Sequence, residues 1–404
     1  MKATIRILAD VERLTSKDDE YDDATIGSMI RHHRHELGKT YNGMAALDAT
    51  RGGDAHWERA MSLFREAERN YLHGFEVEEK SSEEFSNPLE ATGASSTEVT
   101  KAVIQQMTPR RVESLINVRS NVGELLRLRG RYEAAAETVA SALDMAGMAL
   151  EDAHDRATSM LMGDAGSVST VMVDGPGLDE QRNAIVDLLI QMAGIFMSAN
   201  RFDEAAEAYE RALSSHVYFR KWSEGNDGMG QLPNRKTVLP ANTSFSTNPP
   251  KLDLTVATII EATIRRNLAH ALAQIGQNNL SLEHYAASLA IKRHTLGDSH
   301  LEVAHTLMDM GALIGGPMRD FTKALICFKE ALYIFRANLE ECSRAHDIDV
   351  MGENRNAKSS ARTFFDNEDA EEINRSVENA LKNISLLEAA LLKDRDGAST
   401  KRRR

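Results

Sequence analysis

Residues 279–339 read NLSLEHYAASLAIKRHTLGDSHLEVAHTLMDMGALIGGPMRDFTKALICFKEALYIFRANL and contain one helical pattern twice. An aromatic residue is followed, three and four residues later, by a small residue and a leucine, first in Tyr285–Leu289 and again in Phe328–Leu332. This spacing places each set on one face of a helix. The two sets lie 43 residues apart. A period of this size indicates stacked helix pairs, because one pair alone cannot bury its apolar face.

The composition agrees with a helical fold. The chain of 404 residues is 42% hydrophobic and can bury a large core, but only 5% of its residues are aromatic, while Ala and Leu are abundant. Small residues suit closely crossing helices, and residues that favour strands are few. We therefore expect an all-α protein.

Charge and cysteine content narrow the classes of partner and the compartment. The net charge of −13, from 61 acidic and 48 basic residues, disfavours a general nucleic-acid or anionic-membrane surface. Cys327 and Cys342 lack the spacing of a metal site, and no apolar run is long enough for a signal peptide core or a membrane span. We expect an intracellular, chiefly cytoplasmic protein, and the basic tail Arg402–Arg404 leaves a nuclear address open.

The landmarks of residues 279–339 recur earlier in the chain. Residues 116–149 carry Gly123 on a first helix, Gly130 at a turn, and Tyr132, Ala135 and Ala142 on a second helix. The segments RFDEAAEAYERAL at 201–213 and DFTKALICFKEAL at 320–332 have the same second-helix pattern. A small residue is expected where two helices cross closely, and an aromatic residue fills the gap to the next pair.

This order of residues resembles the tetratricopeptide repeat. The resemblance implies an α-solenoid, a right-handed superhelix of helix hairpins, here with long loops between repeats. Residues 262–340 are similar to a narrower variety, the kinesin-light-chain-like repeat, on Leu296–Gly297, His300 and Val303–Ala304. The Pro that usually follows the His is replaced by Leu301. The resemblance therefore supports a repeat subtype, but it does not imply that the protein belongs to a motor complex.

The landmarks divide the chain into an interrupted array. We predict a short N-terminal helix and acidic linker at 1–27, a repeat array at 28–340, a disordered linker at 341–365, a C-terminal capping helix at 366–395 and a basic tail at 396–404. The repeats are expected at about 28–74, 116–149, 186–219, 262–295 and 300–338, with insertions at about 75–108, 150–180 and 214–255. The insertions are either tolerated loops or carriers of short binding motifs.

The inner helices carry candidate ligand contacts. In repeat arrays of the light-chain type, an Asn two residues before the small residue commonly bonds the backbone of a bound peptide, and an amide offers both a donor and an acceptor. Arginines and a histidine on the same helices could pair with an acidic ligand. The peptide-binding candidates are Asn121, Arg119, Arg127, Gln191, Arg266, Asn267, His270 and Asn383. Ordinary hydrogen bonding between helices and solvated helix faces are the alternative interpretations.

Other specialised sites find less support. The carboxylate clamp that binds chaperone tails needs cations where this chain has Asp187 and Gln191. The cluster His32, His33, His35 and Glu36 lacks a second ligand group, so a polar helix surface is favoured over a metal site. No catalytic serine, phosphate-loop, dinucleotide or paired-cysteine motif occurs, and no cofactor is expected.

Together these patterns predict a non-enzymatic interaction scaffold that holds a peptide segment of another protein in a concave groove. Two alternatives stay open. One is a structural subunit that assembles with itself or within a larger complex. The other is a ligand-regulated protein or an enzyme with its site in the insertions. The identity of the partner and the oligomeric state do not follow from the sequence.

Overall fold

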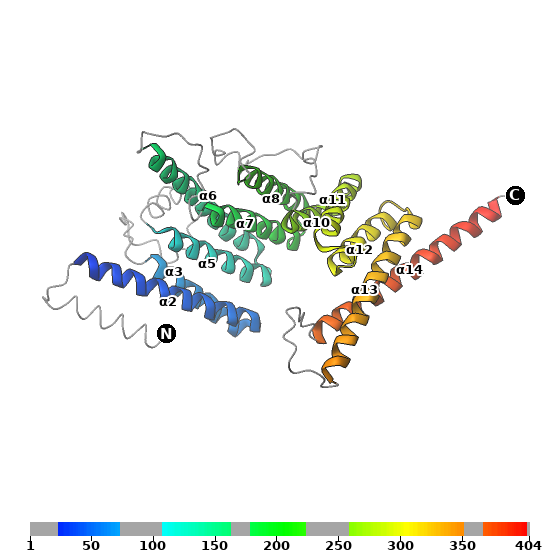
Figure 1. Ribbon diagram of the computed structural model, residues 1–404, viewed down its shortest axis with the longest axis horizontal. Coiled ribbons are helices and arrows are strands. Elements are labelled where there is room, and N and C mark those ends of the chain that lie inside the picture. Colours follow the sequence, from blue (N-terminus) through cyan, green and yellow to red (C-terminus); the bar gives the residue numbers. More distant parts are fainter. Residues whose placement is uncertain (1–22, 73–106, 163–177, 224–257, 351–366, 402–404) are drawn as a thin grey trace. The chain divides into compact units, whose positions relative to one another are not determined.

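The computed structural model describes residues 23–72, 107–162, 178–223, 258–350 and 367–401, and the expected N-terminal segment and most of the insertions lie outside these ranges. The described residues form helices and turns without a strand (Figure 1), so the all-α class is confirmed. The helices are α2 (Asp23–Arg51), α3 (Asp54–Leu72), α5 (Pro109–Leu128), α6 (Tyr132–Met162), α7 (Leu178–Ser198), α8 (Phe202–Ser223), α10 (Ile259–Gln274), α11 (Asn278–Leu296), α12 (Leu301–Gly315), α13 (Phe321–Val350) and α14 (Asn367–Lys401).

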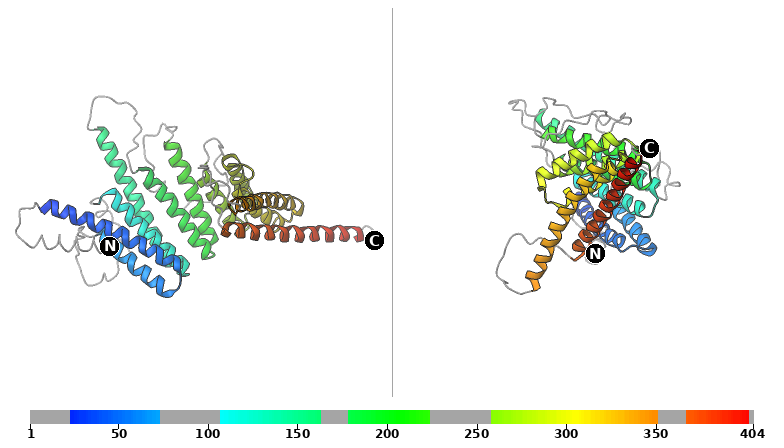
Figure 2. Two further views of the ribbon diagram at one scale, coloured as in Figure 1. Left: turned by 60° about the horizontal axis from the view of Figure 1, so that its bottom comes forward. Right: turned by 90° about the vertical axis from the view of Figure 1, so that its right-hand side faces the viewer.

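The chain forms two compact units, Met1–Ser244 and Phe245–Arg404, whose boundary falls in the insertion predicted at 214–255. In the first unit, helices pack as the antiparallel hairpins α2/α3, α5/α6 and α7/α8, and α6 also packs against α7. The second unit holds the hairpins α10/α11 and α12/α13, and α14 lies beside α13 (Figure 2). This arrangement of adjacent hairpins is that of a helical-repeat solenoid.

The turns within hairpins depend on glycine. Gly130 ends the first helix of one hairpin with φ of 73°, and Gly276 does so in another with φ of 82°. This left-handed conformation strains residues that carry a Cβ atom. Gly52 and Gly53 join α2 to α3 with φ of 67° and 85°. Helix α2 continues to Arg51, and the two glycines close a tight turn before α3 begins at Asp54.

Glycines also allow the close helix crossings that the repeat pattern requires. A Cβ atom added at Gly38 of α2 would lie 2.6 Å from the Tyr71 ring of α3, and one added at Gly123 would lie 2.5 Å from a methyl group of Val139. A Cβ atom added at Gly311 would lie 3.0 Å from the ring of Phe328. Each hairpin of this kind packs the aromatic or branched side chain of its second helix over a glycine of its first.

Three helices run further than the sequence pattern suggests. Helix α6 continues to Met162 into the expected insertion, because the residues from Met145 to Leu150 remain buried against the neighbouring hairpin. Helix α13 continues to Val350 into the expected linker, with Cys342 still buried in the core of the second unit. Helix α14 reaches Lys401, so most of the expected basic tail is helical. The predicted boundaries at 150, 341 and 396 are corrected accordingly.

The core of the second unit explains how α14 closes it. Ile373, Ala380 and Ile384 of α14 are buried in one apolar cluster with Phe328 and Phe335 of α13. These α14 residues recur at steps of seven and four and so form one stripe. The rest of the α14 surface is largely exposed, as suits a helix that ends an array.

Candidate functional site

The first helices of successive hairpins contact one another through polar side chains. In the first unit, Asn121 of α5 donates to Oδ1 of Asn42 of α2 at 3.0 Å. Gln191 of α7 donates to the backbone oxygen of Ser120 at 2.7 Å and accepts from its hydroxyl at 2.8 Å. Two of the predicted peptide-binding amides are therefore partly used to join neighbouring helices. Asn42 was not singled out by the sequence reading, because no period marks it.

Two predicted arginines of the first unit are engaged within the protein. Arg119 forms an ion pair with Glu68 of α3, with Nη2 and Oε1 3.0 Å apart and side-chain exposures of 14% and 4%. It also donates to the hydroxyl of Ser141. Arg127 pairs with Glu124 at 2.6 Å and donates to Ser198 of α7 at 3.0 Å. These guanidinium groups hold hairpins together, and Arg119 is directed away from the exposed surface of α5.

The second unit presents a more accessible arrangement. Nε of Arg266 on α10 lies 2.6 Å from Oδ2 of Asp309 on α12, and both side chains are about one-third exposed, at 30% and 31%. Asn267 and His270 follow Arg266 by one and four residues on α10, where Asn267 is half-buried and His270 is exposed. Among the described residues, neither side chain has a hydrogen-bond partner. We name the surface formed by these four residues the α10–α12 face.

Helix α14 lies near the same side of α12. The carboxylate of Glu372 on α14 raises the pKa of His305 on α12. Burial lowers the pKa of His305, Arg266 lowers it further, and the carboxylates of Glu302, Asp309 and Glu372 oppose this shift. The ring of His305 packs edge-on against Phe335 at 5.1 Å. Asn383, predicted as a ligand contact, is three helical turns from Glu372 on the same flank of α14 and is half-buried.

A buried lysine supports the α10–α12 face from behind. Nζ of Lys292 on α11 lies 2.7 Å from Oε2 of Glu302 and 3.0 Å from the hydroxyl of Thr306, both on α12. Burial lowers the pKa of Lys292, while the contact with Glu302 opposes the shift. The lysine side chain is only 1% exposed. Because its charge is paired with Glu302, Lys292 fixes the register of α12 against α11. The sequence did not predict this role, because no motif marks Lys292.

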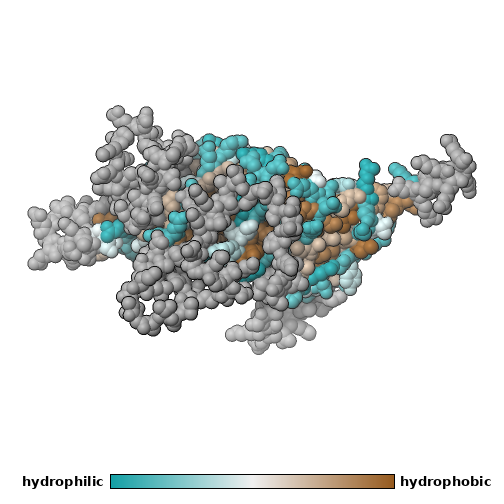
Figure 3. All heavy atoms as spheres, turned by 90° about the horizontal axis from the view of Figure 1, so that it is seen from above, coloured by the Kyte–Doolittle hydropathy of each residue, from teal (hydrophilic) through white to brown (hydrophobic). Residues whose placement is uncertain are grey.

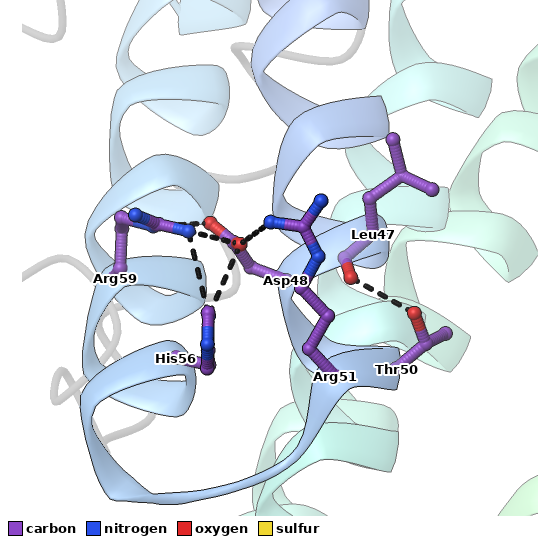
Figure 4. Close-up of polar contacts among 6 residues, drawn as sticks. All are labelled: Leu47, Asp48, Thr50, Arg51, His56 and Arg59. Carbon is purple, nitrogen blue, oxygen red and sulfur yellow. Dashed lines mark hydrogen bonds and ion pairs between the residues drawn. The ribbon is translucent and has the colours of Figure 1, made fainter.

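A polar cluster that the sequence reading also missed lies at the turn of the first hairpin (Figure 4). The carboxylate of Asp48 in the last turn of α2 accepts hydrogen bonds from Nε and Nη2 of Arg59 and contacts His56 and Arg51. The side chain of Asp48 is 7% exposed. The hydrogen bond from Arg59 lowers the pKa of Asp48 to about 2. The signal in the sequence is one acidic residue among the alanines and the leucine that end α2.

The histidine cluster of α2 does not gather into one group. His35 is buried against Tyr71, with ring centroids 5.3 Å apart, whereas Glu36 pairs with Lys39. Within the described ranges, no three side chains of His, Cys, Asp or Glu come together as metal ligands would. Neither cysteine is part of a disulfide. No helix in the part of the chain that the structure covers is long and apolar enough to span a bilayer.

Comparisons with known proteins agree with the hairpin architecture. Residues 260–337 and residues 186–215 each match a model of the tetratricopeptide repeat. Among solved structures, the crystal structure of BtubC (BKLC) from P. vanneervenii matches with 17% sequence identity and a TM-score of 0.39, over 76% of this chain and 90% of that chain. No curated protein matches the sequence.

The hairpins thus define a helical-repeat protein of the α-solenoid class. The matched residues span the third, fourth and fifth predicted repeats, so these segments carry tetratricopeptide repeats. Repeats of this family generally act as scaffolds for protein interaction and are generally not enzymes.

Proposed function

We propose that the α10–α12 face binds an extended peptide segment of another protein. The observation that carries the proposal is the pair Asn267 and His270, of which Asn267 is half-buried and His270 exposed, on α10 beside the Arg266–Asp309 ion pair. An amide side chain can donate to and accept from one residue of an extended backbone, and a neutral imidazole can do the same. Because neither side chain has a hydrogen-bond partner among the described residues, both can form hydrogen bonds to a peptide.

The ion pair adds a reason for binding at this place. Arg266 and Asp309 hold α10 and α12 in register, so the groups around them are fixed before a ligand arrives. Asn383 and His305 extend the polar surface toward α14. The amides of the first unit contribute less to such a site, because Asn121 and Gln191 already bond to neighbouring helices.

A binding experiment with matched controls tests the proposal. Partner peptides are first identified by crosslinking the full chain in lysate, and their affinities are then measured by fluorescence anisotropy. Asn267→Ala and His270→Ala together should raise the dissociation constant about tenfold or more, because hydrogen bonds to a peptide backbone are lost. The controls are Asn279→Ala and His294→Ala, which remove the same side chains from exposed positions on α11. Equal affinities for the double variant and the wild type would refute the proposed site.

A further inference from the structure

The outer surface of the last hairpin differs from that of every earlier hairpin. When the second helices are aligned on their buried landmarks Phe64, Val139, Tyr209, Tyr285 and Phe328, two outward positions can be compared. Two residues before the landmark stand Ser62, Glu137, Glu207, Glu283 and Ile326; five residues after it stand Arg69, Asp144, Ser214, Ala290 and Tyr333. Only α13 combines two large apolar side chains there.

These two side chains are among the most exposed apolar groups of the described residues. Tyr333 is 74% exposed and Ile326 is 61% exposed. Single exposed apolar residues are common, but two on one flank, at positions that are polar or small in the other repeats, indicate a contact surface.

Helix α14 extends the same surface. Nζ of Lys329 on α13 lies 3.1 Å from Oε1 of Glu388 on α14, and both side chains are about half exposed. Ile326 and Tyr333 lie three residues before and four residues after Lys329, while Leu381 and Leu392 lie seven residues before and four residues after Glu388. By helical spacing all four apolar side chains surround the ion pair. Leu381 is 41% exposed and Leu392 is 60% exposed.

The side of α14 that faces away from α13 does not continue the repeat array. Glu378, Lys382, Ser385 and Lys393 are exposed there together with Leu386, which is 60% exposed. A following helix of the repeat type would need a continuous apolar stripe at these positions, whereas the flank that α14 shares with α13 carries both Leu381 and Leu392. Helices α12–α14 lie toward the right of Figure 1. At the right of Figure 3, hydrophobic residues reach the surface beside hydrophilic ones.

We propose that this α13–α14 surface binds a second copy of the chain. It is self-complementary, because opposite charges stand side by side at its centre with apolar groups around them. A two-fold axis that runs between and along the two helices places α13 of one copy over α14 of the other. Lys329 then faces Glu388 of the other copy twice, and the four apolar side chains of each copy cover those of the other. A partner with a different sequence would not require the charges and apolar groups of this surface to complement one another.

The 404-residue chain and two variants test this proposal by sedimentation equilibrium up to about 100 µM. The wild-type chain should dimerise, and Ile326→Lys with Tyr333→Lys should raise the dissociation constant at least about tenfold, because charges replace apolar contacts. Leu47→Lys is the control, since Leu47 is 64% exposed on α2 of the other unit. Circular dichroism verifies that each variant is folded.

Charge reversal distinguishes this dimer from other self-association. Lys329→Glu and Glu388→Lys should each be monomeric alone, because each places like charges opposite one another, and an equimolar mixture of the two should form a heterodimer. A monomeric wild-type protein, dimerisation unaffected by the lysine variants, or a mixture that stays monomeric would each overturn the proposal. The peptide site of the α10–α12 face involves none of these residues, so the two proposals succeed or fail separately.

Discussion

At the scale of single residues, the chain buries charged groups between its helices. Asp48 is almost wholly covered at the first hairpin turn, and Lys292 is covered between α11 and α12. Each is tolerated because its charge is paired and hydrogen-bonded, since an unpaired buried charge is very unfavourable. Such residues give no periodic signal and were visible only once their partners were placed.

The Asp48 cluster makes stability depend on acid pH. Its folded-state pKa of about 2 lies below its ordinary value of 3.8, because the hydrogen bond from Arg59 favours the carboxylate. A lowered folded-state pKa means that the carboxylate stabilises the fold fully above about pH 4 and that this contribution is lost as the pH falls toward 2. Asp48→Asn should therefore lower the free energy of unfolding at neutral pH, and the difference from wild type should shrink below pH 4.

Urea unfolding followed by circular dichroism between about pH 2 and pH 7 measures this difference. Asp54→Asn, which removes an exposed carboxyl group from the other side of the same turn, gives the baseline for a change in charge. If the free energies of unfolding of the wild type and Asp48→Asn differed by the same amount at every pH, the lowered pKa assigned to Asp48 would be contradicted.

At the scale of helices, the crossings are set by glycine. Gly38 and Gly43 lie on the same helix, but only Gly38 faces a neighbour: its added Cβ would meet three atoms of the Tyr71 ring at 2.6 to 2.9 Å, whereas nothing lies within 4 Å of an added Cβ at Gly43. The two glycines therefore separate the cost of a clash from the helix preference of alanine.

Gly38→Ala should destabilise the first unit by about 1–3 kcal/mol, because α2 and α3 must move apart around a fully buried ring. Gly43→Ala should stabilise it by about 0.5–1 kcal/mol, because alanine is the better helix former at an exposed interior position. Thermal and urea unfolding of both variants give the two values. A stabilising Gly38→Ala would show that the Gly38–Tyr71 crossing is not tight.

At the scale of the whole molecule, the array is divided into two compact units, each with its own buried core. The first is built of three hairpins, and the second of two hairpins and α14. We expect residues 1–244 and 245–404, expressed separately, each to be helical and to unfold cooperatively, because neighbouring hairpins supply the apolar contacts within each unit. Calorimetry and circular dichroism of the two fragments measure this. A fragment without a cooperative transition would show that its core depends on the other unit.

Much of this architecture could be predicted from residue periodicity. The apolar steps of three and four, with glycine between two helices and alanine after it, led to the hairpins that contain residues 116–149 and 279–339. Element ends were less accurate: α6, α13 and α14 run on because tertiary burial and continued helix preference extend them past the last periodic residue.

Residue periodicity predicted only part of the candidate site. Residue type and spacing placed Asn121, Gln191, Arg266 and Asn267 on inner helices, but the partner of a long polar side chain depends on which residue a neighbouring helix presents. Asn42 bonds to Asn121, Ser120 bonds to Gln191 and Asp309 pairs with Arg266, whereas the half-buried Asn267 has no hydrogen-bond partner among the described residues.

The sequence by itself determined the helical class and the repeat type, because both depend on local periodicity that every hairpin repeats. Only the tertiary structure decided which amides and charges are used between helices and which face outward, because those contacts join residues 43 to 79 positions apart. It also decided that Lys329 of α13 lies 3.1 Å from Glu388 of α14, because the register between two helices is set by their packing and not by the periodicity of either one.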